Sequence, residues 1–287
     1  MAVAAPVASW TERRRRTSEL RTRQPFVRQV LDFYGALLPV QEDAFLRAAA
    51  DAPSPDRIAS YVAEVVVPRV LDVSIALGPD RLRVELISRM QVQDPRDIVE
   101  RWIAGEEQPV ADRFLARAAL GPVLEALGKE AKAGCAGPRD ALHCPECGGP
   151  PQLSYFAKAA EDLAAGPRQL LCARCASCWG YPRMTCPSCG EDSTGKLLIL
   201  SEEGTSSGER GNVVRGLPGS APGRAGESVF PHMRIETCES CRRYALSIDL
   251  ATDPQAVPVV DELAAVPLDL VARERGFTKI IPNLMGF

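Results

Sequence analysis

Four Cys-x-x-Cys pairs constrain this chain of 287 residues more than any other feature of its sequence. They hold eight of its ten cysteines, and they are Cys144/Cys147, Cys172/Cys175, Cys186/Cys189 and Cys238/Cys241. In each pair the two intervening residues form a tight turn, here called a knuckle, that brings both sulfurs to one point. Two facing knuckles supply four thiolates in a tetrahedral array. The sequence therefore predicts two four-cysteine metal centres.

The order of the knuckles predicts how they pair. We expect the first to face the second, across 24 residues, and the third to face the fourth, across 48 residues. Each pair would lie on short antiparallel hairpins, as in rubredoxin-like and zinc-ribbon modules. In the rival arrangement the second and third knuckles, ten residues apart, share one site and the outer two share the other.

Four thiolates suit either zinc or a single iron ion, because soft ligands in tetrahedral array discriminate weakly between these metals. A full shell of four cysteines leaves no open coordination position, which favours closed structural sites over redox action. Modules of this size hold few apolar residues, so metal binding would supply most of their stability.

The remaining cysteines and the two histidines carry weaker signals. Cys178 continues the rhythm of the second knuckle and is either a substitute ligand or a small packed residue. Cys135 is expected to be a free thiol, and His143 a surface residue beside the first knuckle. His232 receives no role.

Residues 25–133 contain no cysteine and place their apolar side chains at helical spacing. Several runs begin at a proline, which the first helical turn tolerates: Pro25, Pro55, Pro95 and Pro109. Pro68 predicts a kink or break, and Gly128 ends the last run. The pattern predicts a helical domain with its own core.

The basic run Arg13–Arg16 lies in residues 1–24, which we expect to form a flexible, solvated tail. An export signal would need an apolar segment of about 7–15 residues behind the arginines, and the following residues are polar. We therefore expect a cytoplasmic protein with reduced thiols. No apolar stretch reaches the roughly 18–20 residues that cross a bilayer, so membrane insertion is not expected.

The cysteine-rich half is predicted to form short strands. Strand-like runs cover 153–156, 169–172, 196–201, 233–237 and 244–250. Residues 134–183 and 184–250 are expected to form two rubredoxin-like subdomains, the second with a mobile glycine-rich loop over 202–228.

Residues 251–287 predict a C-terminal helix and a docked apolar tail. The helix would run over 257–275, with Pro267 as a kink and Gly276 as its stop. The fold class is α+β: a helical bundle, two four-cysteine subdomains and this last helix.

The cysteine half resembles the formate dehydrogenase accessory protein FdhE family. The likeness rests on His-Cys-Pro-Glu-Cys-Gly-Gly-Pro-Pro at 143–151, Leu-Leu-Cys-Ala-Arg-Cys at 170–175 and Arg-Ile-Glu-Thr-Cys-Glu-Ser-Cys at 234–241. It continues through Val-Asp-Glu-Leu-Ala at 260–264. Two departures are the length of the 202–228 stretch and the cysteine at position 178.

The resemblance implies a cytoplasmic, non-catalytic factor. Such a factor binds the catalytic subunit of a respiratory, molybdenum- or tungsten-containing formate dehydrogenase before its twin-arginine export. The family is associated with iron in its cysteine sites, so iron is the preferred metal and zinc the alternative. Candidate partner contacts are Trp179, Arg183, Asp261, Glu262 and Asp269. Each has a purely structural alternative: hairpin packing, ion pairing or helix capping.

Two other classes of function stay open on the sequence. Rubredoxin-type iron would make the chain an electron-transfer protein acting on the dehydrogenase cofactor. Nucleic-acid binding through zinc ribbons would need a dense basic stripe, which neither the residues nor the net charge of −3 supplies. The chain carries no phosphate loop and no histidine metal triad, so no conventional nucleotide-binding or histidine-metal enzyme site is indicated. A homo-oligomer is compatible with all of these features.

Overall fold

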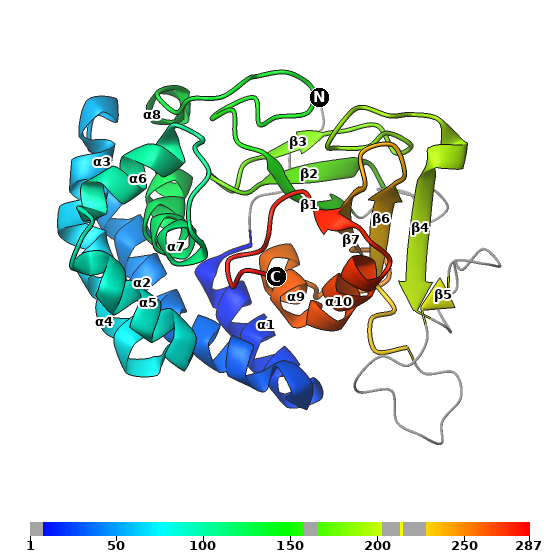
Figure 1. Cartoon of the computed structure of the whole chain (residues 1–287), viewed down its shortest axis with the longest axis horizontal. Coiled ribbons are helices and arrows are strands. Elements are labelled where there is room, and N and C mark those ends of the chain that lie inside the picture. Colours follow the sequence, from blue (N-terminus) through cyan, green and yellow to red (C-terminus); the bar gives the residue numbers. More distant parts are fainter. Residues whose placement is uncertain (1–7, 158–165, 203–212, 215–227) are drawn as a thin grey trace.

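The computed structural model describes residues 8–157, 166–202, 213–214 and 228–287. Helices gather on one side of the molecule and strands on the other, and the C-terminal helices lie between them (Figure 1). The predicted α+β fold is confirmed. No described helix combines the length and apolar character needed to cross a membrane.

The helical domain follows the predicted order. Its helices are α2 (Arg28–Asp51), α3 (Ile58–Tyr61), α4 (Val67–Leu77), α5 (Asp80–Met90), α6 (Pro95–Ile103), α7 (Val110–Ala126) and α8 (Lys129–Ala133). Asp94 caps α6 by accepting a hydrogen bond from the backbone N–H of Arg96 at 2.8 Å. A π-helical turn at Val62–Val66 stands directly before Pro68, where a kink or break was predicted.

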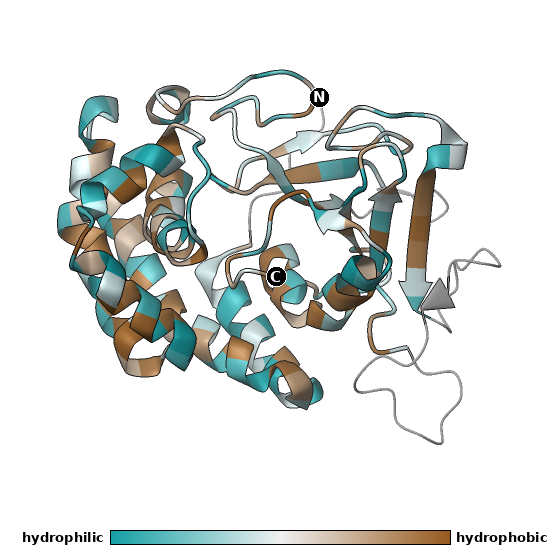
Figure 2. Ribbon diagram, viewed as in Figure 1, coloured by the Kyte–Doolittle hydropathy of each residue, from teal (hydrophilic) through white to brown (hydrophobic). Residues whose placement is uncertain are grey.

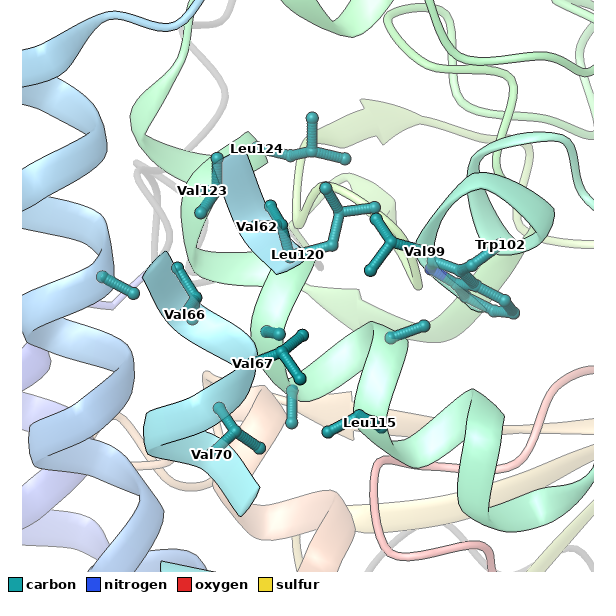
Figure 3. Packing of buried hydrophobic residues seen from close by; sticks show 14 of the residues in the cluster. Val62, Val66, Val67, Val70, Val99, Trp102, Leu115, Leu120, Val123 and Leu124 are labelled. Carbon is teal, nitrogen blue, oxygen red and sulfur yellow. The ribbon is translucent and has the colours of Figure 1, made fainter. Parts of the chain in front are cut away.

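Helix α7 is the centre of this domain. Its side chains Leu115, Leu120 and Leu124 are fully buried. They pack against valines of the π-helical turn and α4, with Val99 and Trp102 of α6 closing one side (Figure 3). This core continues into the sheet half, because the same cluster includes Cys144, Cys147, Cys172 and Cys175.

The prediction of a flexible N-terminal tail is wrong for residues 10–23, which form α1 (Trp10–Arg23). Ser9 and Glu12 close a capping box at its start. Arg16 is only 1% exposed and pairs with Asp261 at 2.5 Å and Asp253 at 2.6 Å. The helix is therefore held by carboxylates from the other end of the chain, which no local pattern reveals.

The strands form one sheet rather than two separate modules. They are β1 (Pro151–Phe156), β2 (Arg168–Cys172), β3 (Cys178–Gly180), β4 (Leu197–Glu202), β5 (Val213–Val214), β6 (Met233–Cys238), β7 (Arg243–Asp249) and β8 (Thr278–Lys279). Their order is β3-β2-β1-β7-β6-β4-β5, with β8 beside β7. Figure 2 shows that β4 is hydrophobic over most of its length, whereas β2 is hydrophilic at its start and hydrophobic towards its end.

Two antiparallel halves make up this sheet. The first half is β1-β2-β3 and the second is β4-β6-β7, and parallel pairing of β1 with β7 joins them. Each half has the same order along the chain: knuckle, strand, strand, knuckle, strand. Most of the predicted 202–228 loop lies outside the described residues, although β5 falls within it.

The predicted C-terminal helix is split into α9 (Pro258–Ala264) and α10 (Val266–Glu274), directly before Pro267. Gly276 stops α10 with φ at +79°, as expected. The tail docks on the fold: β8 extends the sheet beside β7, and Phe277 is buried.

Candidate metal centres

The first two knuckles meet at one site, called site 1. The sulfurs of Cys144, Cys147, Cys172 and Cys175 all lie within 4.8 Å of one another. The Cys144 and Cys175 sulfurs are 3.7 Å apart, and those of Cys147 and Cys172 are 3.4 Å apart. The first knuckle leads into β1 and the second follows β2, so the hairpin places them face to face.

The third and fourth knuckles form site 2 in the same way. The sulfurs of Cys186, Cys189, Cys238 and Cys241 also lie within 4.8 Å of one another. The distance is 3.8 Å both from Cys186 to Cys241 and from Cys189 to Cys238. The predicted pairing of knuckles is confirmed, and the rival arrangement is wrong.

The sulfur spacing fits a tetrahedral ion. Metal–sulfur bonds of about 2.3 Å give a tetrahedron whose edges are about 3.8 Å. Three of the sulfur–sulfur distances, at 3.7–3.8 Å, match that edge, and the Cys147–Cys172 distance of 3.4 Å is shorter. All the cysteines are free thiols rather than disulfides. Zinc and a single iron ion both suit such a donor set.

The knuckle turns share one backbone design. In each, the carbonyl of the first cysteine accepts a hydrogen bond from the N–H four residues later, at 2.8–3.2 Å. That later residue has positive φ: Gly148 at 67°, Ala176 at 57°, Gly190 at 78° and Arg242 at 56°. Glycine takes this conformation after the first and third knuckles, whereas alanine and arginine take it in the other two.

Site 1 is tightly enclosed. All four cysteines are buried, and they belong to the same hydrophobic cluster as the helical core. A Cβ on Gly149 would lie 2.8 Å from the Cys172 sulfur, so only glycine fits there. Hydrogen bonds from the neighbouring thiols, Cys147 first, lower the pKa of Cys144 because they stabilise its thiolate.

Buried cations surround site 1. Arg174 is 4% exposed and donates to the carbonyls of Ala136 at 2.7 Å and Cys147 at 2.9 Å. Lys132 pairs with Glu146 of the first knuckle at 2.9 Å. Four thiolates around a divalent ion carry net negative charge, which these cations offset in a water-poor setting.

Site 2 is open by comparison. Cys189 is exposed and Cys241 is half-buried. The carboxylate of Glu191 bridges the two knuckles: it accepts from Ser240 at 2.6 Å and from the N–H of Ser193 at 3.0 Å. These hydrogen bonds, Ser240 first, lower the pKa of Glu191 to about 2.

The other cysteines and histidines stand apart from both sites. Cys178 lies on β3, and burial raises its pKa to about 11. Cys135 is buried, and His143 contacts Asp140 at 2.7 Å near the surface. His232 is buried against Asp261 at 2.8 Å. With Asp253 these groups are spaced like metal ligands, but Arg16 already occupies their carboxylates.

Three of the predicted partner contacts are corrected by their burial. Asp261, Glu262 and Asp269 are at most 1% exposed. Asp261 binds Arg16, while Lys279 pairs with Glu262 at 2.8 Å and with Asp269 at 3.0 Å. These carboxylates fasten α9 and α10 to α1 and the tail, and so they present no surface to a partner.

Trp179 and Arg183 lie closer to the surface. Trp179 sits half-buried on β3, an end strand of the sheet, and donates from Nε1 to the Ala141 carbonyl at 3.4 Å. Arg183 is exposed and stacks over the ring of Phe156 at 5.0 Å. Their role as partner contacts stays a prediction.

Sequence reasoning missed the polar network that joins the two layers. Arg117 of α7 donates to Gln152 of β1, which in turn donates to Glu262 of α9. Burial lowers the pKa of Arg117 to about 10. Local sequence patterns do not reveal this network, because Arg117, Gln152 and Glu262 come from segments that are distant along the chain.

Fold and sites together define an α+β protein in which a helical domain is joined to a sheet bearing two four-cysteine clusters able to hold metal ions. Residues 223–285 match the family described as FdhE, C-terminal domain. A protein FdhE homolog from Aquifex aeolicus is 34% identical over 147 residues, which cover 50% of this chain and 42% of that relative. One from Pseudomonas aeruginosa is 30% identical over 142 residues, covering 50% and 38%.

These sequence matches span less than half the length of both curated relatives. A solved structure, the crystal structure of the FdhE protein from Pseudomonas aeruginosa, shares the fold with a TM-score of 0.60. It is 22% identical, and the match covers 99% of this chain and 97% of that one. The resemblance to the FdhE family, carried by the knuckle motifs, is confirmed.

Proposed function

We propose that this chain is an accessory protein of formate dehydrogenase. It binds the catalytic subunit of a respiratory enzyme in the cytoplasm, supports its maturation before export and catalyses no reaction itself. The observation that carries this proposal is the pair of closed four-cysteine centres within a chain that resembles FdhE. A filled shell of thiolates leaves no coordination position for a substrate.

Metal ions at both sites would cross-link strands of the sheet. The two knuckles of site 1 would hold a divalent ion, iron by preference and zinc as the alternative, and so tie β1 to β2 against the helical core. Site 2 would tie β4 to β6 and β7. The sheet then offers a fixed docking face, with Trp179 and Arg183 at its β3 end as proposed contacts.

Capture of the dehydrogenase tests the proposal. The purified chain, immobilised with its metal, is exposed to cytoplasm that contains the immature catalytic subunit, and the metal of the same sample is measured. We expect the subunit to be retained together with about two metal equivalents. Failure to retain it under both aerobic and anaerobic conditions would contradict the proposed role.

The exposure of site 2 favours a second candidate, rubredoxin-type electron transfer. Cys189 reaches the surface, and electron exchange with a partner requires such access. An iron-loaded, oxidised protein should absorb in the visible range and bleach on reduction. A colourless zinc protein would remove this candidate and leave the accessory role intact.

A further inference from the structure

A cleft of about 990 Å³ opens between the two layers of the protein. Its walls come from the loop between α6 and α7, the backbone beside the first knuckle, and the tail at 276–282. The cleft is at the upper end of the size of small-molecule pockets. Neither metal site opens into it through a cysteine side chain.

Cationic side chains dominate this cleft. Arg113, Arg243 and Arg273 line it, each from a different element. Within the described part of the chain, no side-chain hydrogen bond or ion pair reaches Arg113 or Arg273. Of the two acidic residues in the lining, Glu106 is already paired with Arg101 at 3.0 Å.

Arg113 is only half-exposed, which makes its lack of a direct partner informative. Burial lowers its pKa, and Glu107 at the rim opposes this effect only from a distance. A guanidinium that loses water without gaining a carboxylate costs free energy in the unbound protein. A bound anion would recover that cost.

The wall also holds buried polar atoms without partners among the described residues. They are the donors Trp102 Nε1 and Arg174 Nε and the acceptor Gln108 Oε1. Trp102 and Arg174 are at least nine-tenths buried, and Trp102 stands at the edge of the helical core (Figure 3). A fully ionised phosphate offers only acceptors, whereas a polypeptide offers both N–H donors and carbonyl or carboxylate acceptors.

Apolar surface completes the lining. Phe277, Ile281 and Pro282 of the tail face the cleft beside the arginines. A lining with both apolar and cationic side chains complements a segment with both apolar and acidic side chains.

We infer that this cleft binds an acidic stretch of polypeptide, and that Arg113 and Arg273 receive its carboxylates. The inference rests on the proposed function, because the segment would belong to the catalytic subunit that the chain accompanies. It places the partner contact in the cleft between the layers.

The test measures affinity for the purified catalytic subunit in three metal-loaded proteins. They are the unchanged chain, the double variant Arg113→Met/Arg273→Met, and the control Arg81→Met/Arg83→Met. Methionine keeps the apolar stem of the half-buried Arg113. The control removes the same charge from α5, whose residues do not line the cleft. Unfolding curves and metal content establish that both variants fold.

We expect the cleft variant to bind at least about tenfold more weakly and the control to bind as the unchanged chain does. A 15-residue polyglutamate peptide should compete with the subunit, and polyglutamine of the same length should not. Hydrogen exchange at 104–108 and 276–282 should slow in the complex.

Each other outcome has a distinct meaning. If all three proteins bind the subunit equally well, the cleft is not the binding site, and the proposed accessory function is unaffected. No binding by the unchanged chain overturns the accessory function instead. If pyrophosphate competes at lower concentration than polyglutamate, the cleft takes phosphate and the choice of a polypeptide is wrong.

Discussion

Sites 1 and 2 have the same ligands and the same turns but opposite surroundings. Every cysteine of site 1 is buried, and the site shares one hydrophobic cluster with the helical domain. Site 2 belongs to the second half of the sheet, and one of its cysteines is exposed and another is half-buried. The chain order of each half is the same, so the difference comes from what packs against it.

This difference separates two roles for one kind of site. Site 1 lies where the sheet meets the helical core, so its metal would fix the relation between the two layers. Site 2 would organise mainly its own hairpins and remain accessible to solvent and partners. Two sites with the same four ligands can therefore differ in how much they stabilise the fold and in how fast they exchange metal.

The largest expected effect is the loss of site 1. Cys144→Ala should lose one metal equivalent and lower the free energy of unfolding by at least about 4 kcal/mol, because unpaired thiols would remain in the core. Cys189→Ala should also lose one equivalent but cost only about 1–2 kcal/mol. Denaturant unfolding with metal analysis checks both, and equal costs would break the comparison.

Metal exchange should separate the sites next. A thiophilic reagent reaches the exposed Cys189 directly, whereas site 1 opens only when the layers part. We expect one metal equivalent to leave at least about tenfold faster than the other. If Cys189→Ala no longer shows the fast phase of metal release, that phase belongs to site 2. If it loses the slow phase instead, the assignment of the two sites is reversed.

A single methyl group probes how closely site 1 is packed. Gly149→Ala places a Cβ 2.8 Å from the Cys172 sulfur and should cost about 1–3 kcal/mol with faster metal loss at site 1. Gly195→Ala, whose Cβ meets nothing within 4 Å, is the matched control in the turn before β4. If Gly149→Ala has the same free energy of unfolding and the same rate of metal release as the control, site 1 is less tightly packed than this distance implies.

Local chemistry made much of the cysteine region predictable. Knuckle spacing and the glycines at 148 and 190 act over five residues, so the pairing and turn conformations could be predicted. Helix starts at proline and the stop at Gly276 depend on equally short signals. The docked tail followed from its unusual apolar content.

What escaped prediction depends on contacts between distant segments. Arg16 reads as a solvated basic residue until Asp261, 245 positions away, is placed beside it. The same pairing removes Asp261 from the surface, so two mistaken predictions have one cause. The single sheet likewise depends on β1 meeting β7 in parallel, which no hairpin signal encodes.

The smallest expected effect concerns the bridge across site 2. Glu191→Gln keeps the shape but weakens the hydrogen bond from Ser240, and it should speed metal release from site 2 severalfold without changing site 1. Because the folded-state pKa of Glu191 is lowered to about 2, its bridging carboxylate stabilises the fold above the ordinary glutamate pKa of about 4.3 and is lost only as the pH falls towards 2. The ratio of variant to unchanged release rates should therefore be the same at pH 7 and pH 4, where a carboxyl with the ordinary pKa would be mostly protonated. A ratio that shrinks at pH 4 would show that the carboxylate titrates normally, and that exposure alone sets the lability of site 2.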